Sequence, residues 1–149
     1  MGNQQERLVS LGYLAGVIDG EGWLGLTKSR KARQLRPIIA VHMVGAATLD
    51  HLEEICTSLG WSSHVWHGKD SSRWGLWGYD KVAQVLPMLT PILFVKHRQA
   101  ILLQEAIDLR AQRPLRSDPS PEEFAVREAI SALNTKGKRN NPRARILRD

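Results

Sequence analysis

Two acidic residues, Asp19 and Glu21, end an apolar segment and are the side chains best suited to metal chemistry. Gly12, Gly16 and Gly20 precede or separate them at four-residue spacing, so these glycines share one face of a predicted helix. Each interior glycine costs a helix about 1 kcal/mol relative to alanine. The alternatives are chance placement and close backbone approach by a second helix, which small residues permit.

No other segment has a matching small-residue face, so the expected partner is the same helix of a second copy, packed around a two-fold axis. The predicted dimer contact consists of Gly12, Ala15, Gly16 and Asp19. This contact would bring four carboxylates together, and like charges that close repel unless a cation neutralises them. Hard oxygen ligands suit Mg²⁺. Two interpretations stand at this point: a structural helix end, or a symmetric site for metal-dependent phosphodiester hydrolysis.

Basic residues are concentrated in two short blocks. The sequence has 21 Lys and Arg against 15 Asp and Glu, a formal net charge of +6. About half of the cations fall within residues 28–36 and 136–148, and neither block contains an acid. A solvated loop with a disordered tail is one interpretation, and a polyanion-binding surface is the other. Charge alone does not separate DNA from RNA.

Hydrophobic periodicity predicts an alternation of helices and hairpins. Three- and four-residue spacing predicts helices over residues 6–20, 48–59, 79 onward, 95–111 and 122–133. Gly20 and Gly22 are expected to stop the first helix, Thr48 to cap the second, and Pro87 and Pro91 to break the third. Period-two alternation predicts strands over residues 23–31, 36–44, 64–67 and 73–77.

The order of these elements, αββαββα, predicts an α+β fold in which one four-stranded antiparallel sheet has its helices on one face. We expect a single domain over residues 1–149, with a basic tail from residue 134. The opposite sheet face is then left uncovered. Its predicted outward side chains are Thr27, Ser29, Lys31, Arg36, His42, Trp66, Arg73 and Trp77. A twisted antiparallel ribbon fits the major groove of DNA, which is about 12 Å wide.

Composition points to an intracellular protein. The single cysteine, Cys56, lies in an apolar helical stretch and is expected to be a buried reduced thiol. No run approaches the roughly 18 apolar residues of a membrane span, and residues 1–7 are polar with no signal-like core. The expectation is a protein of the prokaryotic cytoplasm or of an organelle, with no targeting signal and no membrane partner.

The segment Leu14-Ala15-Gly16-Val17-Ile18-Asp19-Gly20-Glu21-Gly22 resembles the motif of the LAGLIDADG homing endonucleases, including the preceding Tyr13. The resemblance extends to the order of the elements, to residues 89–100 and to the Ala132-Leu133-Asn134 ending. A single copy of the motif is similar to the homodimeric branch of that family.

The resemblance implies a site-specific endonuclease with a saddle-shaped sheet. Such an enzyme would bind a long, nearly palindromic double-stranded DNA site as a homodimer, cleave both strands across the minor groove, and serve to copy a mobile intron. It implies that Glu21 and the Gly20 carbonyl hold a catalytic Mg²⁺, with Mn²⁺ or Ca²⁺ able to take its place. Lys96 would act near the scissile phosphate, and Asp19 would support the helix end.

Residues expected to contact DNA combine the outward sheet positions with the two basic blocks. They are Thr27, Ser29, Arg30, Lys31, Arg33, Arg36, His42, Trp66, Arg73, Lys136, Lys138 and Arg139.

Two positions depart from the family pattern. Glu21 stands where aspartate is commoner, so the carboxylate is retained one methylene further from the backbone. Residues 44–47, Val-Gly-Ala-Ala, stand where a polar residue often holds the attacking water; His42, Thr48 or a water network are the alternatives. The rival functions are an RNA maturase or a non-cleaving DNA-binding protein of the same fold. A basic RNA-binding or ribosomal protein would explain the charge but not the glycine-faced helix.

Overall fold

A computed structural model describes residues 3–30 and 33–139, with only the backbone described for 136–139. Along these residues the elements are α1 (Gln4–Glu21), β1 (Gly22–Lys28), β2 (Leu35–Met43), α2 (Ala47–Ser58), β3 (His64–His67), β4 (Ser72–Trp77), α3 (Tyr79–Leu89), α4 (His97–Ala111) and α5 (Pro121–Arg139). The predicted α+β class and the predicted element order are confirmed. Over the described residues, every helix is too short or too polar to cross a membrane.

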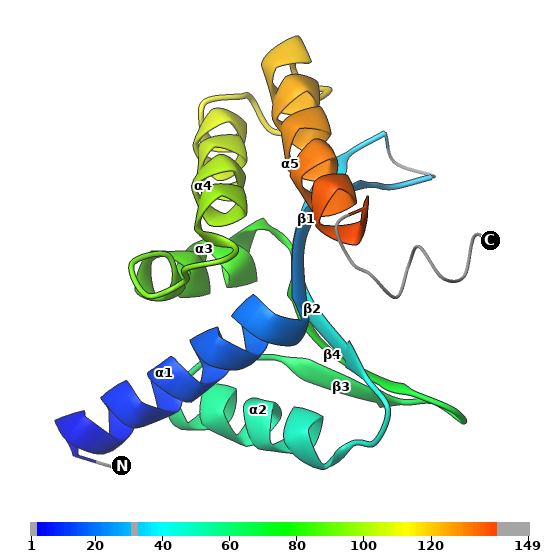
Figure 1. Cartoon of the computed structure of the whole chain (residues 1–149). Coiled ribbons are helices and arrows are strands. Elements are labelled where there is room, and N and C mark those ends of the chain that lie inside the picture. Colours follow the sequence, from blue (N-terminus) through cyan, green and yellow to red (C-terminus); the bar gives the residue numbers. More distant parts are fainter. Residues whose placement is uncertain (1–2, 31–32, 140–149) are drawn as a thin grey trace.

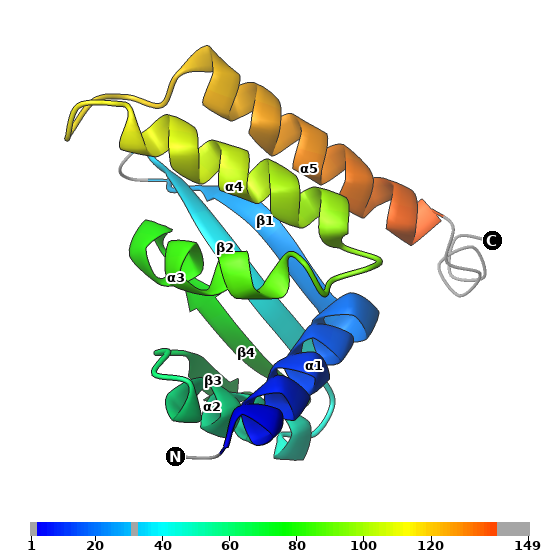
Figure 2. The same ribbon diagram turned by 90° about the vertical axis from the view of Figure 1, so that its left-hand side faces the viewer.

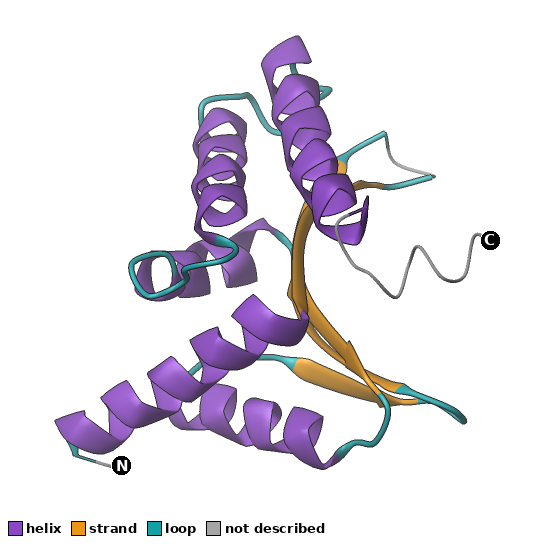
Figure 3. Cartoon of the chain, viewed as in Figure 1, coloured by secondary structure: helices purple, strands orange, loops and turns teal. Residues whose placement is uncertain are grey.

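The four strands form one antiparallel sheet in the order β1-β2-β4-β3. Helices α1 to α4 lie on one face of this sheet, as the two perpendicular views show (Figure 1, Figure 2). The strands form a curved, twisted layer, and no helix crosses the middle of the other face (Figure 3). The prediction of a sheet with one helix-covered and one open face is therefore confirmed.

Alternate side chains of the strands fill the core between the sheet and the helices, and the small residues Gly25, Ala40 and Gly75 between them are also buried. Leu24, Ile39 and Trp74, from three adjacent strands, are fully buried against the helices, and their strand neighbours point to the open face. Leu14 and Ile18 of α1 complete this core. The predicted burial of Cys56 on α2 is also confirmed, and burial raises the pKa of its thiol to about 11.

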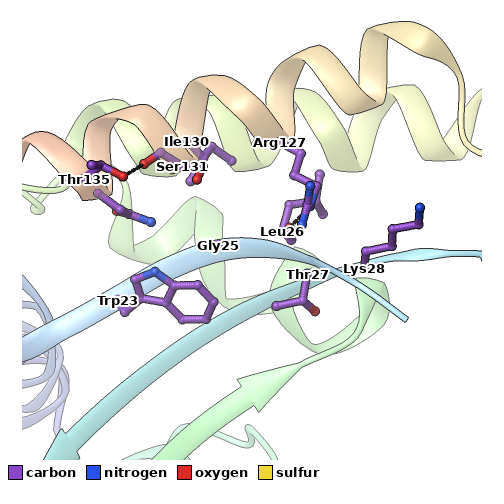
Figure 4. A pocket seen from close by; sticks show the side chains of 10 residues that line it. Trp23, Gly25, Leu26, Thr27, Lys28, Arg127, Ile130, Ser131 and Thr135 are labelled. Atoms are coloured by element: carbon purple, nitrogen blue, oxygen red, sulfur yellow. Dashed lines mark hydrogen bonds between the residues drawn. The ribbon is translucent and has the colours of Figure 1, made fainter. Parts of the chain in front are cut away.

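Helix α5 covers the open edge of β1. The Arg127 Nε donates to the Leu26 carbonyl at 3.1 Å, and the Asn134 amide donates to the Leu24 carbonyl at 3.0 Å. The cleft between the two elements is lined by Trp23 and by polar residues of α5 (Figure 4). The prediction that the helix ends at residue 133 is wrong, because Asn134 is held by this bond and α5 continues to Arg139.

Four other predicted boundaries are also wrong, each for a local reason. β1 ends at Lys28 and not at residue 31, because the Ser29 N–H closes the hairpin on the Gln34 carbonyl. Ala46, not Thr48, is the N-cap of α2, and it makes no side-chain cap bond. Of the two glycines expected to stop α1, Gly20 lies within the helix, which continues to Glu21, and Gly22 is its C-cap. Of the two prolines expected to break α3, Pro87 lies within the helix, where the burial of Leu89 offsets the lost helical bond, and Pro91 follows the end of the helix at Leu89.

A buried ion pair anchors the start of α5. The Arg113 Nε lies 2.7 Å from the Glu123 carboxylate, whose side chain has no solvent exposure. Glu123 also forms a capping box with Ser120, accepting from its N–H and donating its own N–H to the Ser120 hydroxyl. Burial raises the pKa of Glu123, but the bonds from the Ser120 backbone and from Arg113 outweigh it, so the pKa lies below its ordinary value.

We predict that Glu123→Ala lowers the free energy of unfolding by about 3–5 kcal/mol at pH 7, because it leaves the Arg113 charge buried and unpaired. The Glu123 contribution is present above its unfolded pKa of about 4.3 and is lost as the pH falls through its lower folded pKa. Urea unfolding at pH 7 and pH 3 measures both effects. Glu122→Ala, at an exposed neighbouring position, is the control; equal losses for the two variants would contradict the assignment.

Candidate active site and nucleic-acid interface

Helix α1 has one face in the core and an open glycine face opposite to it. At about 100° per residue, the direction away from the buried Leu14 and Ile18 is that of Gly16 and Gly20, both of which are exposed. A Cβ atom added at Gly12, Gly16 or Gly20 would meet nothing within 4 Å. The glycine face is therefore free surface in a single chain.

The other two residues of the predicted dimer contact lie elsewhere on α1. Ala15 is only 3% exposed and packs in the core of its own chain. The Asp19 carboxylate is half-buried and forms hydrogen bonds within the chain. The exposed apolar side chains that do flank the glycines are Val9 and Tyr13.

Asp19 holds the connection between α3 and α4. Its carboxylate accepts from the Phe94 N–H at 2.8 Å and from the Lys96 N–H at 3.1 Å. Its carbonyl accepts from the Lys96 ammonium at 2.8 Å. Both carboxylate oxygens thus have partners, and α4 begins at His97 rather than at the predicted Val95 because Asp19 fixes the preceding turn.

Lys96 supplies the positive charge that α1 lacks in its last turn. Its ammonium lies at the negative end of the helix dipole, where a cation is favoured. Partial burial lowers the pKa of Lys96, and the nearby carboxylates of Asp19 and Glu21 partly offset that effect. The structure therefore brings Lys96 to the same helix end as Glu21.

Glu21 is the last residue of α1, and its carboxylate is exposed. Gly22 continues directly into β1, and a Cβ there would lie 2.6 Å from the Ile18 carbonyl oxygen, so this close turn requires glycine. Gly20 is among the last residues of the helix, where carbonyl groups have no helical donor. One chain thus offers the Glu21 carboxylate and the Gly20 carbonyl as hard oxygen ligands, a donor set that suits Mg²⁺.

These ligands are too few to hold an ion in one chain. Within residues 3–30 and 33–139, no three His, Cys, Asp or Glu side chains cluster as a metal site would require. Two oxygen ligands would leave most positions of an octahedral Mg²⁺ to groups other than these residues.

His42 is the polar residue at the end of β2 that lies nearest this turn in register. Gly22 pairs with Val41, so His42 is the next residue along β2. Its Nε2 lies 2.7 Å from the Ser71 hydroxyl. Val44 is exposed and apolar, and Thr48 lies inside the first turn of α2. Of His42 and Thr48, the two side chains that could hold the attacking water, His42 is therefore the one on the open sheet face.

The open sheet face carries a row of aromatic and cationic side chains. Thr27, Arg36, His42, Trp66, Arg73 and Trp77 alternate with core residues and point to this face, as predicted. The Trp66 and Trp77 rings stack with centroids 4.4 Å apart. No local sequence pattern indicates this stack, because it depends on which strands are neighbours.

The remaining predicted DNA-contact residues are less regularly placed. Ser29 and Arg30 lie in the β1–β2 loop and not in the strand, and Arg33 is exposed there with a φ of 51°. Lys31 lies outside the described residues. Lys136, Lys138 and Arg139 belong to the last turns of α5, where only the backbone is described.

No family model and no curated protein matches the sequence. Solved structures do match the fold: the homing endonuclease I-CvuI in complex with the I-CreI target has a TM-score of 0.68 and 17% identity, covering 86% of this chain and 83% of that one. The archaeal intron-encoded homing endonuclease I-Vdi141I complexed with DNA has a TM-score of 0.59 and 12% identity, covering 85% and 98%. The chain has the LAGLIDADG homing endonuclease fold.

Other proteins with the LAGLIDADG fold are about twice as long. The I-SmaMI LAGLIDADG homing endonuclease bound to cleaved DNA has a TM-score of 0.62 and 13% identity, and the match covers 89% of this chain but 49% of that one. This chain therefore corresponds to one LAGLIDADG unit, which makes up a whole I-Vdi141I chain and about half of an I-SmaMI chain.

We predict that Asp19→Ala lowers the free energy of unfolding by about 1–2 kcal/mol, because the Phe94 and Lys96 N–H groups lose a charged acceptor. Hydrogen exchange at these two amides should become faster than in the wild type, while exchange at the amides within α4 should change less. Asp19→Asn keeps one acceptor oxygen and should show a smaller change. Unaltered exchange at both amides in Asp19→Ala would contradict the role assigned to this carboxylate.

Proposed function

We propose that this chain is a site-specific endonuclease that cleaves double-stranded DNA as a homodimer with a divalent metal, and that it is encoded by a mobile intron. The observation that carries the proposal is the end of α1, where a free Glu21 carboxylate lies beside a fixed Lys96 and next to an open glycine face. Similar solved structures include I-CvuI complexes with DNA in Mg or Ca and the intron-encoded I-Vdi141I with DNA.

The glycine face supports a homodimer. Val9 is 67% exposed, and Tyr13 is also exposed, on the side of α1 that faces away from the core. Glycines at Gly12 and Gly16 let two helix backbones approach closely, while the flanking apolar side chains are removed from water. A two-fold axis along this face would place both Glu21 carboxylates and both Gly20 carbonyls near one another.

The two Glu21 side chains and Gly20 carbonyls would hold the metal. A bound divalent ion supplies a water of lowered pKa and positive charge at the phosphate oxygens. Asp19 would not bind the metal, because both oxygens of its carboxylate already accept hydrogen bonds from the turn that carries Lys96. The Lys96 ammonium has three donors and gives one to the Asp19 carbonyl, so two remain for oxygens whose charge grows during cleavage.

His42 would complete this site as the group that orients the attacking water. Its ring is held by the Ser71 hydroxyl on the open face, one residue beyond the strand partner of Gly22. An imidazole has two ring nitrogens, so the nitrogen not bound to Ser71 is able to contact water. The maturase and non-cleaving alternatives require no such water and no free Glu21 carboxylate.

We predict that Glu21→Gln retains DNA affinity within a few-fold and abolishes cleavage in Mg²⁺, because the amide keeps the shape of the side chain but removes its charge. Binding and cleavage of a target selected from a randomised duplex library measure the two effects separately. Glu128→Gln, an exposed change on α5, is the matched control and should cleave normally. Full-rate cleavage by Glu21→Gln would rule out this mechanism.

We predict that Gly16→Leu weakens the dimer by at least about tenfold, because the larger side chain separates the two helices. Sedimentation equilibrium measures the monomer–dimer constant. The control is Ala125→Leu, which adds an apolar side chain at an exposed helical position on α5. The glycine face is not the interface if both variants dimerise like the wild type.

A further inference from the structure

Two arginines lie at the ends of the Trp66–Trp77 stack on the open sheet face. The Arg73 Cζ is 4.7 Å from the centroid of the Trp66 ring, and the Arg36 Cζ is 5.9 Å from that of Trp77. The two indole rings are nearly parallel, with an interplanar angle of 21°. The resulting order is arginine, tryptophan, tryptophan, arginine, across β2, β3 and β4.

The neighbouring residues hold this stack in place. The ring of His64 packs edge-on against Trp66 at 4.5 Å. Gly75 lies beside the stack, and a Cβ there would be in ordinary van der Waals contact with the Trp77 ring at 3.5 Å, so this ring lies close over the strand backbone. The rings therefore form a platform on which the two guanidinium groups rest.

The guanidinium donors of Arg36 and Arg73 have no acidic partner in the described part of the chain. An arginine normally loses considerable side-chain freedom when it binds, and cation–π contact with an indole fixes the group beforehand. The planar fork matches the O6 and N7 atoms of guanine in the major groove. Both arginines project from strands onto the open sheet face, the surface that would face the DNA groove, where contacts to base edges carry the sequence information.

We propose that Arg36 and Arg73 each read one guanine in every half-site, with the Trp66–Trp77 stack as the platform that orients them. This inference rests on the proposed function, because it names the bases that the DNA-binding face recognises. Between the two arginines, the indole rings would present an apolar surface to the major groove. Such a surface suits the methyl groups of thymine rather than base edges that form hydrogen bonds.

The geometry also limits how far apart the two guanines lie. The distances along the row keep the two Cζ atoms at most about 15 Å apart, which corresponds to about four steps of roughly 3.4 Å in B-DNA. The selected half-site should therefore contain two G·C pairs within about five base pairs of each other.

The test starts with selection of bound sites from a randomised duplex library by the full-length protein in Ca²⁺. Fluorescence anisotropy then compares the selected duplex with duplexes in which each guanine is replaced by adenine. We expect the wild type to lose about fivefold to a hundredfold in affinity at each of the two guanines. Arg73→Lys and Arg36→Lys should each remove the preference at one guanine and leave the other intact.

Trp66→Leu tests the platform, because it keeps an apolar side chain but removes the ring beneath Arg73. It should weaken the preference at the same guanine as Arg73→Lys. Arg7→Lys, an exposed cation on α1 outside this face, is the matched control and should retain both preferences. Circular dichroism verifies that each variant is folded.

The outcomes separate this inference from the proposed function. Failure of the wild type to bind any duplex would overturn the proposed function and this inference together. Binding to half-sites without two nearby guanines would overturn the inference alone. The same holds if Arg73→Lys weakens all duplexes equally, because uniform loss is the signature of a phosphate contact.

Discussion

The hydrogen bonds of Asp19 are the interaction on which the arrangement of the site depends. Asp19 is in the first helix, and its carboxylate fixes the turn at Phe94 and Lys96, which is 75 or more residues further along the chain. That turn carries Lys96, whose ammonium returns to the Asp19 carbonyl and so to the neighbourhood of Glu21. Asp19 and Glu21, which are separated by one glycine, thus have different roles. The Asp19 carboxylate fixes the turn, and the Glu21 carboxylate stays exposed. Their difference arises from direction, since side chains two positions apart on a helix point about 160° away from each other.

Helix α1 packs in the core with one face and is exposed on the other. Leu14 and Ile18 fill the space above the sheet, while Gly16 and Gly20 leave the opposite face bare. The turn at Gly22 passes without a loop into β1, so the orientation of the sheet is tied to that of the helix. In the proposed dimer, a single rigid connection would therefore set both the position of the metal ligands and the angle at which each sheet meets DNA.

Features with local signals could be predicted from the sequence, and features that depend on tertiary contacts could not. The β3–β4 hairpin, the open face and the residues of the motif follow from alternation and spacing within short segments. The Asp19–Phe94 bond joins residues 75 positions apart, and the Trp66–Trp77 stack requires knowledge of the sheet order. Both Pro87 and Asn134 lie inside helices that the sequence predicts to end there. The burial of Leu89 offsets the helical bond lost at Pro87, and Asn134 is held by its hydrogen bond to the Leu24 carbonyl.

Because α5 covers the edge of β1, this edge is closed to pairing with a strand of another molecule. A bare edge strand is a template onto which any extended segment can add, and that is a common start of fibre growth. Here Arg127 and Asn134 occupy the carbonyls that an added strand would use. The opposite edge, β3, has four residues and offers little length for pairing. One edge strand of the sheet is covered and the other is short. The sheet can therefore leave one whole face exposed without adding strands from other molecules.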